Sequence, residues 1–360
     1  MAGETKVSAS ERMSAPGRGT RVLLFYDGYE LQAEPGFTGA IYAQTRRAAR
    51  YVYRTLRRTQ VWTGFYTAFR SLRQSLERYG CEVHVNNFRL ARRDPSYPIG
   101  LAGYPSILSK LSLPNPLIFG PGDYGFPDTA ASFAQEPRVR RLIQPSEWAA
   151  DLYRPYCGDK MLVWPVGIDT DTWADATAHP KSVDFVVYDK IRWFREREVP
   201  RVLQRVTSHL EKGGYSYRVL RYGEHHLSQF SRLLRQSRAM IFLCEHETQG
   251  LAYQEAMACN VPILAWDEGI LVDPQQQRFI TPGLNVSAVP YFDARCGERF
   301  KLPEFEAVFA EFVNRLGQYR PREYVVENLS LTHAAQAYLE AYTSCLPHAS
   351  RPSRSSAQPT

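Results

Sequence analysis

The stretch RAMIFLCEHETQGLAYQEAMACNVPILAW, residues 238–266, contains one complete unit of alternating structure. RAMIFLCE and VPILAW are short apolar runs typical of buried strands, and EHETQ between them is a polar loop from which a helix starts at Gly250. The order strand, loop, helix, strand predicts two parallel strands joined by a helical crossover. We therefore expect an α/β fold.

The same alternation extends outward in both directions from this unit. VDFVVY and YSYRVLRY precede it as strands, with helices expected near residues 196–212 and 226–236, and RVLLFY, CEVHVN, PLIFG, RLIQP and KMLVWP form an earlier series. Such alternation is typical of parallel sheets covered on both faces. We expect two doubly wound, Rossmann-like domains facing a central cleft, over residues 21–166 and 167–345, with flexible tails at 1–20 and 346–360.

Composition narrows the class of protein. The chain has 360 residues, of which 44% are hydrophobic, enough for two packed domains. It contains no run of eighteen apolar residues and no apolar leader, which predicts a cytoplasmic protein. The six cysteines are scattered without a CxxC pair, so we expect reduced thiols and no metal site.

Positive charge is concentrated near the amino terminus. Residues 35–76 contain eight arginines and no acidic residue. Arg46, Arg50, Arg54 and Arg57 recur at helical spacing, while another face carries an apolar stripe of Ile41, Ala48, Ala49, Val52 and Leu56. This helix is expected to meet either the anionic inner face of a membrane, as a peripheral protein would, or a phosphate-bearing acceptor, although a solvated helix face has the same pattern. No base-reading module accompanies the arginines, so no nucleic acid is expected.

Two glutamates in the central unit indicate its chemistry. Glu247 lies in the loop at the carboxyl end of a strand and Glu255 lies in the second turn of the following helix, so both can face one ligand. The amides of Gly250 and Leu251 open that helix, where unpaired N–H groups attract phosphate. Carboxylates are good acceptors for paired sugar hydroxyls. The spacing therefore suits a nucleotide sugar.

The residues quoted so far carry a family resemblance. ETQGLAYQEAMACNVPILAWDEG resembles the E-x7-E region of retaining glycosyltransferases of the GT-B fold, as in glycosyltransferase family 4, where EGFGLxxLEAMAxGxPVVA is common. LIQPSEWAADLYR with VWPVGIDTDTW is similar to the segment that links the two domains in that family, and LSLTHAAQAYLEAY to its last helix, which packs back on the N-terminal domain. The resemblance covers residues 140–345. It implies a hexosyltransferase or other glycosyltransferase (EC 2.4) that moves a sugar from a nucleotide-sugar donor to a carbohydrate or lipid-linked hydroxyl acceptor, with retention and without metal or cofactor.

The resemblance also implies roles for individual residues. Glu255 would hold the ribose, Glu247 the donor sugar at the catalytic centre, and the segment around the helix start the diphosphate, namely Thr248, Gln249, Gly250 and Leu251. Lys190 and Arg192, in YDKIRW, replace the family's usual phosphate-binding cations, with Lys190 also placed among the catalytic groups. The base would lie near Tyr222 and Gly223.

The acceptor side departs from the family pattern. The usual glycine-rich loop after the first strand is missing, with Thr63-Gly64 as a displaced remnant. Asp123, in GPGDYGFPD, is the catalytic candidate from this half, although a simple turn explains the same residues. Asp169-Thr170-Asp171 spells a D-x-D metal signature of another fold class, but its place in the linker favours a turn.

Other functions share this fold. A nucleotide-sugar epimerase or phosphorylase is one alternative, and a non-catalytic relative that binds nucleotide or an anionic membrane is another. The nucleotide, the sugar and the acceptor are left open by the sequence. Surface polysaccharide or glycolipid biosynthesis is expected by analogy alone.

Overall fold

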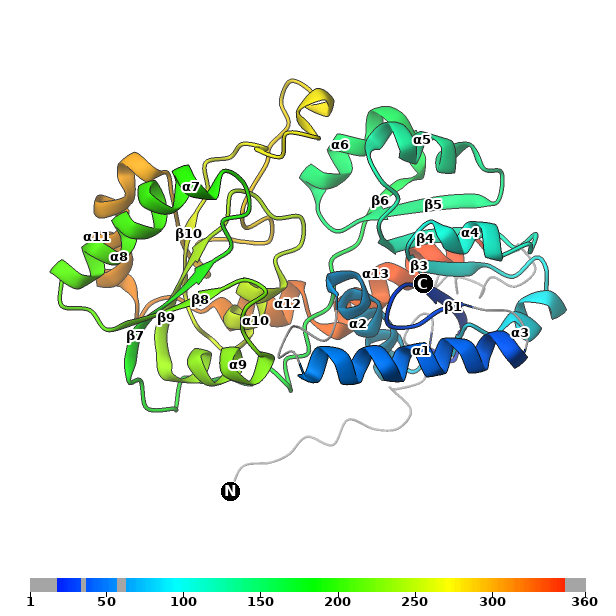
Figure 1. The fold of residues 1–360 in the computed structure, drawn as a ribbon, viewed down its shortest axis with the longest axis horizontal. Coiled ribbons are helices and arrows are strands. Elements are labelled where there is room, and N and C mark those ends of the chain that lie inside the picture. The colour runs from blue at the N-terminus through cyan, green and yellow to red at the C-terminus, as the bar shows by residue number, and fades with distance from the viewer. Residues whose placement is uncertain (1–17, 34–36, 57–62, 347–360) are drawn as a thin grey trace, which may run out of the picture.

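The computed structural model describes residues 18–33, 37–56 and 63–346. Most of the two predicted tails and Arg57 lie outside these ranges, and the side chain of Arg54 is not described. The chain forms two parallel sheets, each covered by helices on both faces (Figure 1). The expected α/β fold with two parallel-sheet domains is confirmed. No helix in the described ranges is long and apolar enough to cross a membrane.

The N-terminal sheet has six parallel strands in the order β2-β1-β3-β4-β5-β6. Their bounds are β1 (Arg21–Asp27), β2 (Glu82–Val85), β3 (Ile99–Gly103), β4 (Leu117–Gly122), β5 (Val139–Gln144) and β6 (Met161–Val163). Sequence analysis did not predict β3, because IGLAG is short and rich in small residues. Its Gly100 is required by packing, since a Cβ there would lie 2.1 Å from the Tyr338 hydroxyl.

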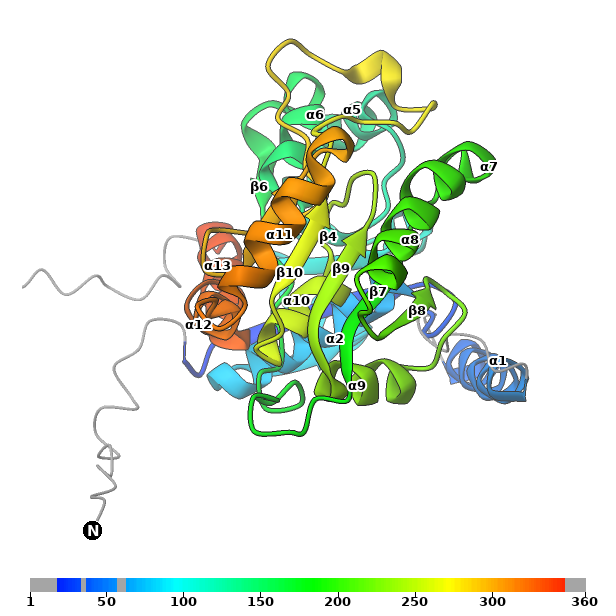
Figure 2. The same cartoon turned by 90° about the vertical axis from the view of Figure 1, so that its left-hand side faces the viewer.

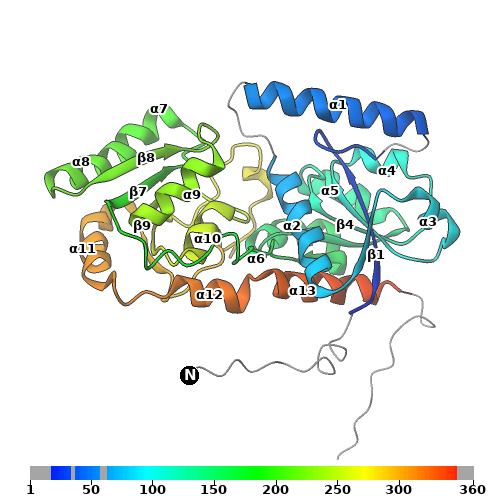
Figure 3. The same cartoon turned by 90° about the horizontal axis from the view of Figure 1, so that it is seen from below.

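Successive residues of β1 point to opposite faces of this sheet and enter two separate cores. One core holds α2 (Gly64–Tyr79) and α13 (Leu331–Ser344), and the other holds α3 (Phe88–Arg93), α4 (Ser106–Lys110), α5 (Pro127–Gln135) and α6 (Glu147–Cys157). The helix α1 (Phe37–Leu56) lies outside both layers, along one side of the domain (Figure 3).

The C-terminal sheet has five parallel strands in the order β11-β10-β9-β7-β8. The strands are β7 (Val183–Asp189), β8 (Tyr217–Arg221), β9 (Ser237–Leu243), β10 (Ile263–Trp266) and β11 (Gly297–Phe300). Figure 2 views this domain, in which α8 (Gln204–Lys212) and α11 (Phe305–Arg315) share one core. The other core is formed with α9 (Leu227–Gln236), α10 (Leu251–Ala258) and α12 (Pro321–Asn328). The edge strand β11 was not predicted, because GERF is short and mostly polar.

The helix expected near residues 196–212 is one continuous helical segment with a change of pitch. It runs from α7 (Arg195–Glu198) through a π-helical turn (Val199–Leu203) into α8. The turn contains Pro200, whose missing N–H interrupts regular α-helical bonding.

Two features tie the domains together. The carboxyl-terminal α13 lies on the N-terminal domain, where the Tyr342 hydroxyl accepts from the Leu23 amide at 2.9 Å and donates to the Pro98 carbonyl at 2.6 Å. A long loop, residues 267–296, extends from the C-terminal domain toward α5 and α6 (Figure 1). It packs Leu271, Phe279 and Val286 in a core with residues of α6. Both contacts fix how the strand ends of the two sheets face each other.

Candidate functional site

The loop after β9 lies where the two domains meet. The indole N–H of Trp148, at the start of α6, donates to the Glu247 carbonyl at 3.0 Å. The Gln249 side chain accepts from the Val166 amide at 2.9 Å and donates to Gln254 at 2.8 Å. Because Glu247 follows β9 and Trp148 follows β5, the carboxyl ends of both sheets face this junction, the usual ligand position in doubly wound folds.

Two predicted catalytic residues, Lys190 and Glu247, form an ion pair here. Their side chains are only 11% and 8% exposed. Burial by itself raises the pKa of Glu247, but Lys190 and Arg192 hold it below its usual value. Burial likewise opposes the charge on Lys190, and Glu247 raises the pKa of that lysine above its usual value. Both groups are therefore charged, in a site that excludes most of the solvent.

Glu245, which sequence analysis did not select, holds the turn that carries Lys190. Its buried carboxylate accepts from the amides of Arg192 and Trp193, both at 3.0 Å. The guanidinium of Arg192 donates to the carbonyl of His246, which ties the turn to the loop after β9. The only signal in the sequence was a third acid in EHE, at the end of an apolar strand.

His246 was also missed, and it lies between aromatic rings from both domains. Its ring stacks on Trp193 with centroids 4.4 Å apart and meets Trp148 edge-on at 5.7 Å. Burial, with a contribution from Arg192, lowers the pKa of His246 to about 3, so its imidazole is neutral. This stack closes one wall of the junction.

The start of α10 has the geometry of an anion-binding helix end. Gly250 has φ +79°, and a Cβ at this position would lie 2.0 Å from the Tyr253 ring. Only glycine fits, since other residues rarely adopt this conformation. Within the described residues, no acceptor is recorded for the amides of Gln249, Gly250 and Leu251, whereas Thr248 donates to the Glu247 carboxylate at 3.2 Å.

Glu255 lies one turn into α10 and is partly buried. Burial raises its pKa to about 8, and no basic residue in the described ranges offsets that effect. None of the described residues donates a hydrogen bond to its carboxyl group. Glu247 and Glu255 therefore differ: the first is ionised by its lysine partner, whereas the second is uncompensated.

The remaining predicted residues lie around these groups. Tyr222, 44% exposed, follows β8; its ring lies under the Lys190 ammonium at 4.5 Å, and Gly223 next to it has φ +81°. Asp123 follows β4 on the N-terminal side and is exposed. Its carboxylate accepts from the Gly125 amide at 2.9 Å, which is the turn that the alternative interpretation described.

The D-x-D segment has structural partners. Arg78, in α2, binds Asp169 at 3.0 Å and Asp171 at 2.7 Å, and Asp169 also accepts from Gln74. Thr63 caps the start of α2 by accepting from the Tyr66 amide. Among the described residues no three metal-binding side chains gather at one point.

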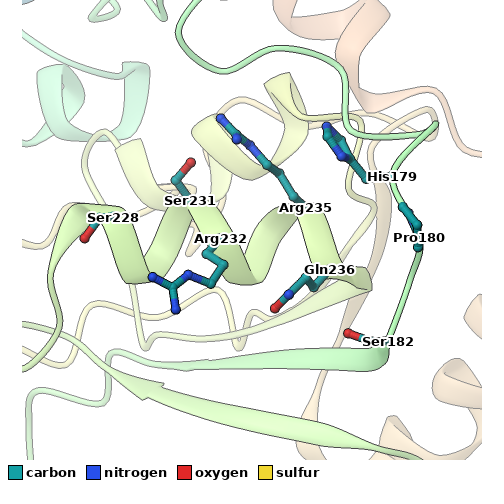
Figure 4. Close-up of a pocket in the computed structure, with 8 residues that line it drawn as sticks. All are labelled: His179, Pro180, Ser182, Ser228, Ser231, Arg232, Arg235 and Gln236. Atoms are coloured by element: carbon teal, nitrogen blue, oxygen red, sulfur yellow. The ribbon is translucent and has the colours of Figure 1, made fainter.

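A groove lies elsewhere, on the C-terminal domain. It has a volume of about 710 Å³ and runs along α9, lined by residues such as His179, Ser182, Arg232 and Arg235 (Figure 4). Ser182 precedes β7, so this groove lies at the amino ends of the strands. The junction around Glu247 is at their carboxyl ends. Size alone therefore does not identify the site.

Two solved structures resemble this chain over most of its length. AviGT4, a glycosyltransferase involved in avilamycin A biosynthesis, is 12% identical with a TM-score of 0.50, over 89% of this chain and 97% of that one. Sucrose-phosphate synthase from Thermosynechococcus elongatus is 11% identical with a TM-score of 0.53, over 90% and 98%. The chain has the GT-B fold.

At this low identity the likeness establishes the fold alone. No protein-family model and no curated protein sequence matches the chain. The chemistry of the GT-B junction in this protein therefore has to be argued from its own residues.

Proposed function

We propose that this protein is a glycosyltransferase that moves a sugar from a nucleoside-diphosphate sugar to a hydroxyl acceptor. The observation that carries the proposal is the set of groups around α10. The helix opens with amides that have no acceptor among the described residues. The Lys190–Glu247 pair and Glu255, to which none of those residues donates, stand beside them. The α10 amides and Lys190 can bind a diphosphate. Glu247 and Glu255 can accept hydrogen bonds from sugar hydroxyls.

The proposed roles follow from position. Glu255, inside α10, accepts the ribose hydroxyls, and Glu247, at the domain junction, orients the donor sugar. Tyr222 and Gly223 border the base. The Lys190 ammonium lies between Glu247 and the Tyr222 ring, where it can also meet the diphosphate.

We propose that transfer retains the anomeric configuration, with the acceptor hydroxyl attacking on the face from which the diphosphate leaves. The leaving phosphate oxygen takes the proton, and Lys190, with the helix start, stabilises the charge that builds on it. Asp123 would contribute from the acceptor side. Replacing Lys190 by alanine should then lower turnover more than donor binding, and equal losses would argue against this role.

No metal or other cofactor enters this proposal. Both aspartates of the D-x-D segment are engaged by Arg78, and the cationic charge that a diphosphate needs is supplied by Lys190 and the α10 amides. Addition of chelator should leave turnover unchanged.

The decisive experiment is a thermal-shift panel of UDP, GDP, ADP, CDP and dTDP on the wild type and on Glu255→Ala. A ligand at about a hundred times its dissociation constant stabilises by about 2.7 kcal/mol, which is readily seen. One nucleotide should raise the midpoint temperature of thermal unfolding of the wild type but not that of the variant. A panel with no shift would refute the donor site. An epimerase or phosphorylase of the same fold would instead bind the nucleotide or phosphate without transferring sugar to a hydroxyl acceptor.

We further propose a cytoplasmic enzyme that associates with a membrane surface through α1, as surface polysaccharide or glycolipid assembly requires. The structure supports a particular face of the helix. Arg50 is half-buried against Tyr29, whereas Ile41 and Val52, on the opposite side, are 53% and 55% exposed. The apolar stripe, and not Arg46 or Arg50, is thus the side that would enter an anionic bilayer interface.

Vesicle co-sedimentation tests this association. Wild-type protein should pellet with vesicles containing anionic lipid, and an Ile41→Ser/Val52→Ser variant should lose most of that binding. The outward side chains are exposed, so the variant should fold normally. Equal binding by both proteins would refute the proposed face, and no binding by either would refute the association.

A further inference from the structure

A small pocket in the N-terminal domain is not used by the donor chemistry. It has a volume of about 230 Å³ and lies at the carboxyl ends of β1 and β3, on the side of the sheet where Asp123 follows β4. We call it the β1–β3 pocket; its lining includes Gln32, Tyr29, Tyr104, Arg46 and Lys110. Its place in the fold is opposite the α10 site, across the junction of the two domains.

The floor of the pocket is satisfied internally. Asp27, at the end of β1 and only 3% exposed, accepts from the Ser106 hydroxyl at 2.8 Å, from Lys110 at 3.0 Å and from the Ala33 amide at 3.2 Å. With three donors its carboxylate is fully engaged in holding β1 to α4. Asp27 is therefore a structural group, and its charge is offset by Lys110.

The wall of the pocket, in contrast, carries polar atoms without partners. The Gln32 side-chain oxygen is buried and has no hydrogen-bond partner among the described residues. Arg46, which is exposed, forms no hydrogen bond or ion pair with any described residue. Buried polar atoms are rarely left unpaired, because each costs about 1–3 kcal/mol. Gln32 and Arg46 thus leave one acceptor and one cationic donor that a ligand can satisfy.

Aromatic rings also line the pocket. Tyr29 and Tyr104 meet edge-to-face with centroids 5.4 Å apart, and the Arg50 guanidinium lies 4.3 Å over the Tyr29 ring. The Asp123 amide donates to the carbonyl of Gly103, the residue before Tyr104, at 2.9 Å. A ligand against these rings would thus lie near the candidate acceptor-side acid.

We propose that the β1–β3 pocket binds the acceptor of the transfer reaction, and that this acceptor is a sugar carrying an oxyanion, as a phosphate ester or a carboxylate. Arg46 binds the oxyanion, a sugar hydroxyl donates to Gln32, and the sugar ring lies against Tyr104. This inference rests on the proposed glycosyl transfer. It adds the chemical class of the acceptor and the residues that select it.

Binding of defined probes to the full chain tests the inference. Glucose 1-phosphate, methyl glucuronide, neutral methyl glucoside and inorganic phosphate are titrated calorimetrically in the presence of the nucleotide that stabilises the protein, or without nucleotide if none does. At least one anionic sugar should bind about tenfold or more tightly than the neutral glucoside, the difference that one charge-assisted contact typically makes. The two anionic probes distinguish a phosphate from a carboxylate.

Matched variants on one helix assign the contact. Arg46→Gln should weaken the anionic sugar about tenfold, while Arg47→Gln, an exposed neighbour outside the pocket lining, should not. The thermal shift caused by nucleotide should be the same in both variants. Failure of the proposed nucleotide site would therefore be distinguished from failure of the proposed acceptor pocket. The proposal would be overturned if neutral and anionic sugars bound with equal affinity, or if inorganic phosphate bound as tightly as the anionic sugar. It would also be overturned if Arg46→Gln left the affinity unchanged, or if no probe bound.

Discussion

Glu255 offers a test in which the sign and size of the effect both follow from the structure. Burial raises its pKa from 4.5 to about 8, and none of the cations in the described part of the chain offsets this shift. The folded protein therefore keeps a proton that the unfolded chain loses. A raised carboxyl pKa gives stability that is complete below about pH 4.5 and is lost as the pH rises toward 8.

The magnitude can be stated for pH 7. There the unfolded chain is about 2.5 pH units above the carboxyl's ordinary pKa, and at about 1.4 kcal/mol per unit the native state is disfavoured by roughly 3 kcal/mol. Glutamine has nearly the same shape as the protonated acid and cannot ionise. Glu255→Gln should therefore be more stable than the wild type by up to about 3 kcal/mol at pH 7, and by almost nothing at pH 4.

Urea unfolding of both proteins at intervals between pH 4 and pH 9 measures this difference. It should grow with pH and level off above about pH 8. Glu340→Gln, at an exposed position of α13, is the matched control and should show no such growth. A pH-independent difference at position 255 would refute the reasoning. The same Glu255→Gln variant should bind nucleotide more weakly than the wild type above pH 8, which would separate the functional role from the stability cost.

Three further perturbations follow from the site. Lys190→Met should lower the unfolding free energy by about 3–5 kcal/mol, because it leaves Glu247 buried and unpaired. The double variant Lys190→Met/Glu247→Leu should recover much of that loss, as measured by chemical denaturation. Gly250→Ala should lower the unfolding free energy by at least about 1–3 kcal/mol, since its Cβ would collide with the Tyr253 ring. It should also remove the thermal shift that nucleotide causes. A variant that still binds nucleotide would contradict the proposed helix-start site. Trp148→Phe keeps an aromatic ring but removes the donor to the Glu247 carbonyl, so it should lower the unfolding free energy by about 1 kcal/mol. An unchanged midpoint of urea unfolding would show that this hydrogen bond does not contribute to stability.

The fold was largely accessible from apolar patterning. Strands such as β7 and β9 are buried on both faces and therefore read as continuous apolar runs. The two strands that were missed, β3 and β11, are short, and one is rich in glycine while the other is polar. Their pairing is dictated by neighbouring strands and not by their own residues, so local patterns could not show them.

The helix α1 illustrates a different limit. Its periodicity predicted the helix, and the helix is present. The arginines were expected to form one face toward a membrane or an acceptor. Arg50 instead packs on Tyr29, and Arg46, although exposed, lines a pocket, while Ile41 and Val52 on the opposite side are exposed. Periodicity shows which residues share a face, but only the packed structure shows where that face points.

The grouping of Glu247, Gly250 and Glu255 was determined largely by the sequence, because these residues lie within one strand-loop-helix unit whose geometry is local. What the tertiary structure alone decided is the state of these groups. Lys190, which follows another strand, neutralises Glu247, whereas none of the described residues neutralises Glu255, so two glutamates in one motif have opposite pKa shifts. Charge compensation depends on which distant side chains a fold brings within a few ångströms, and burial sets how strongly each charge is felt.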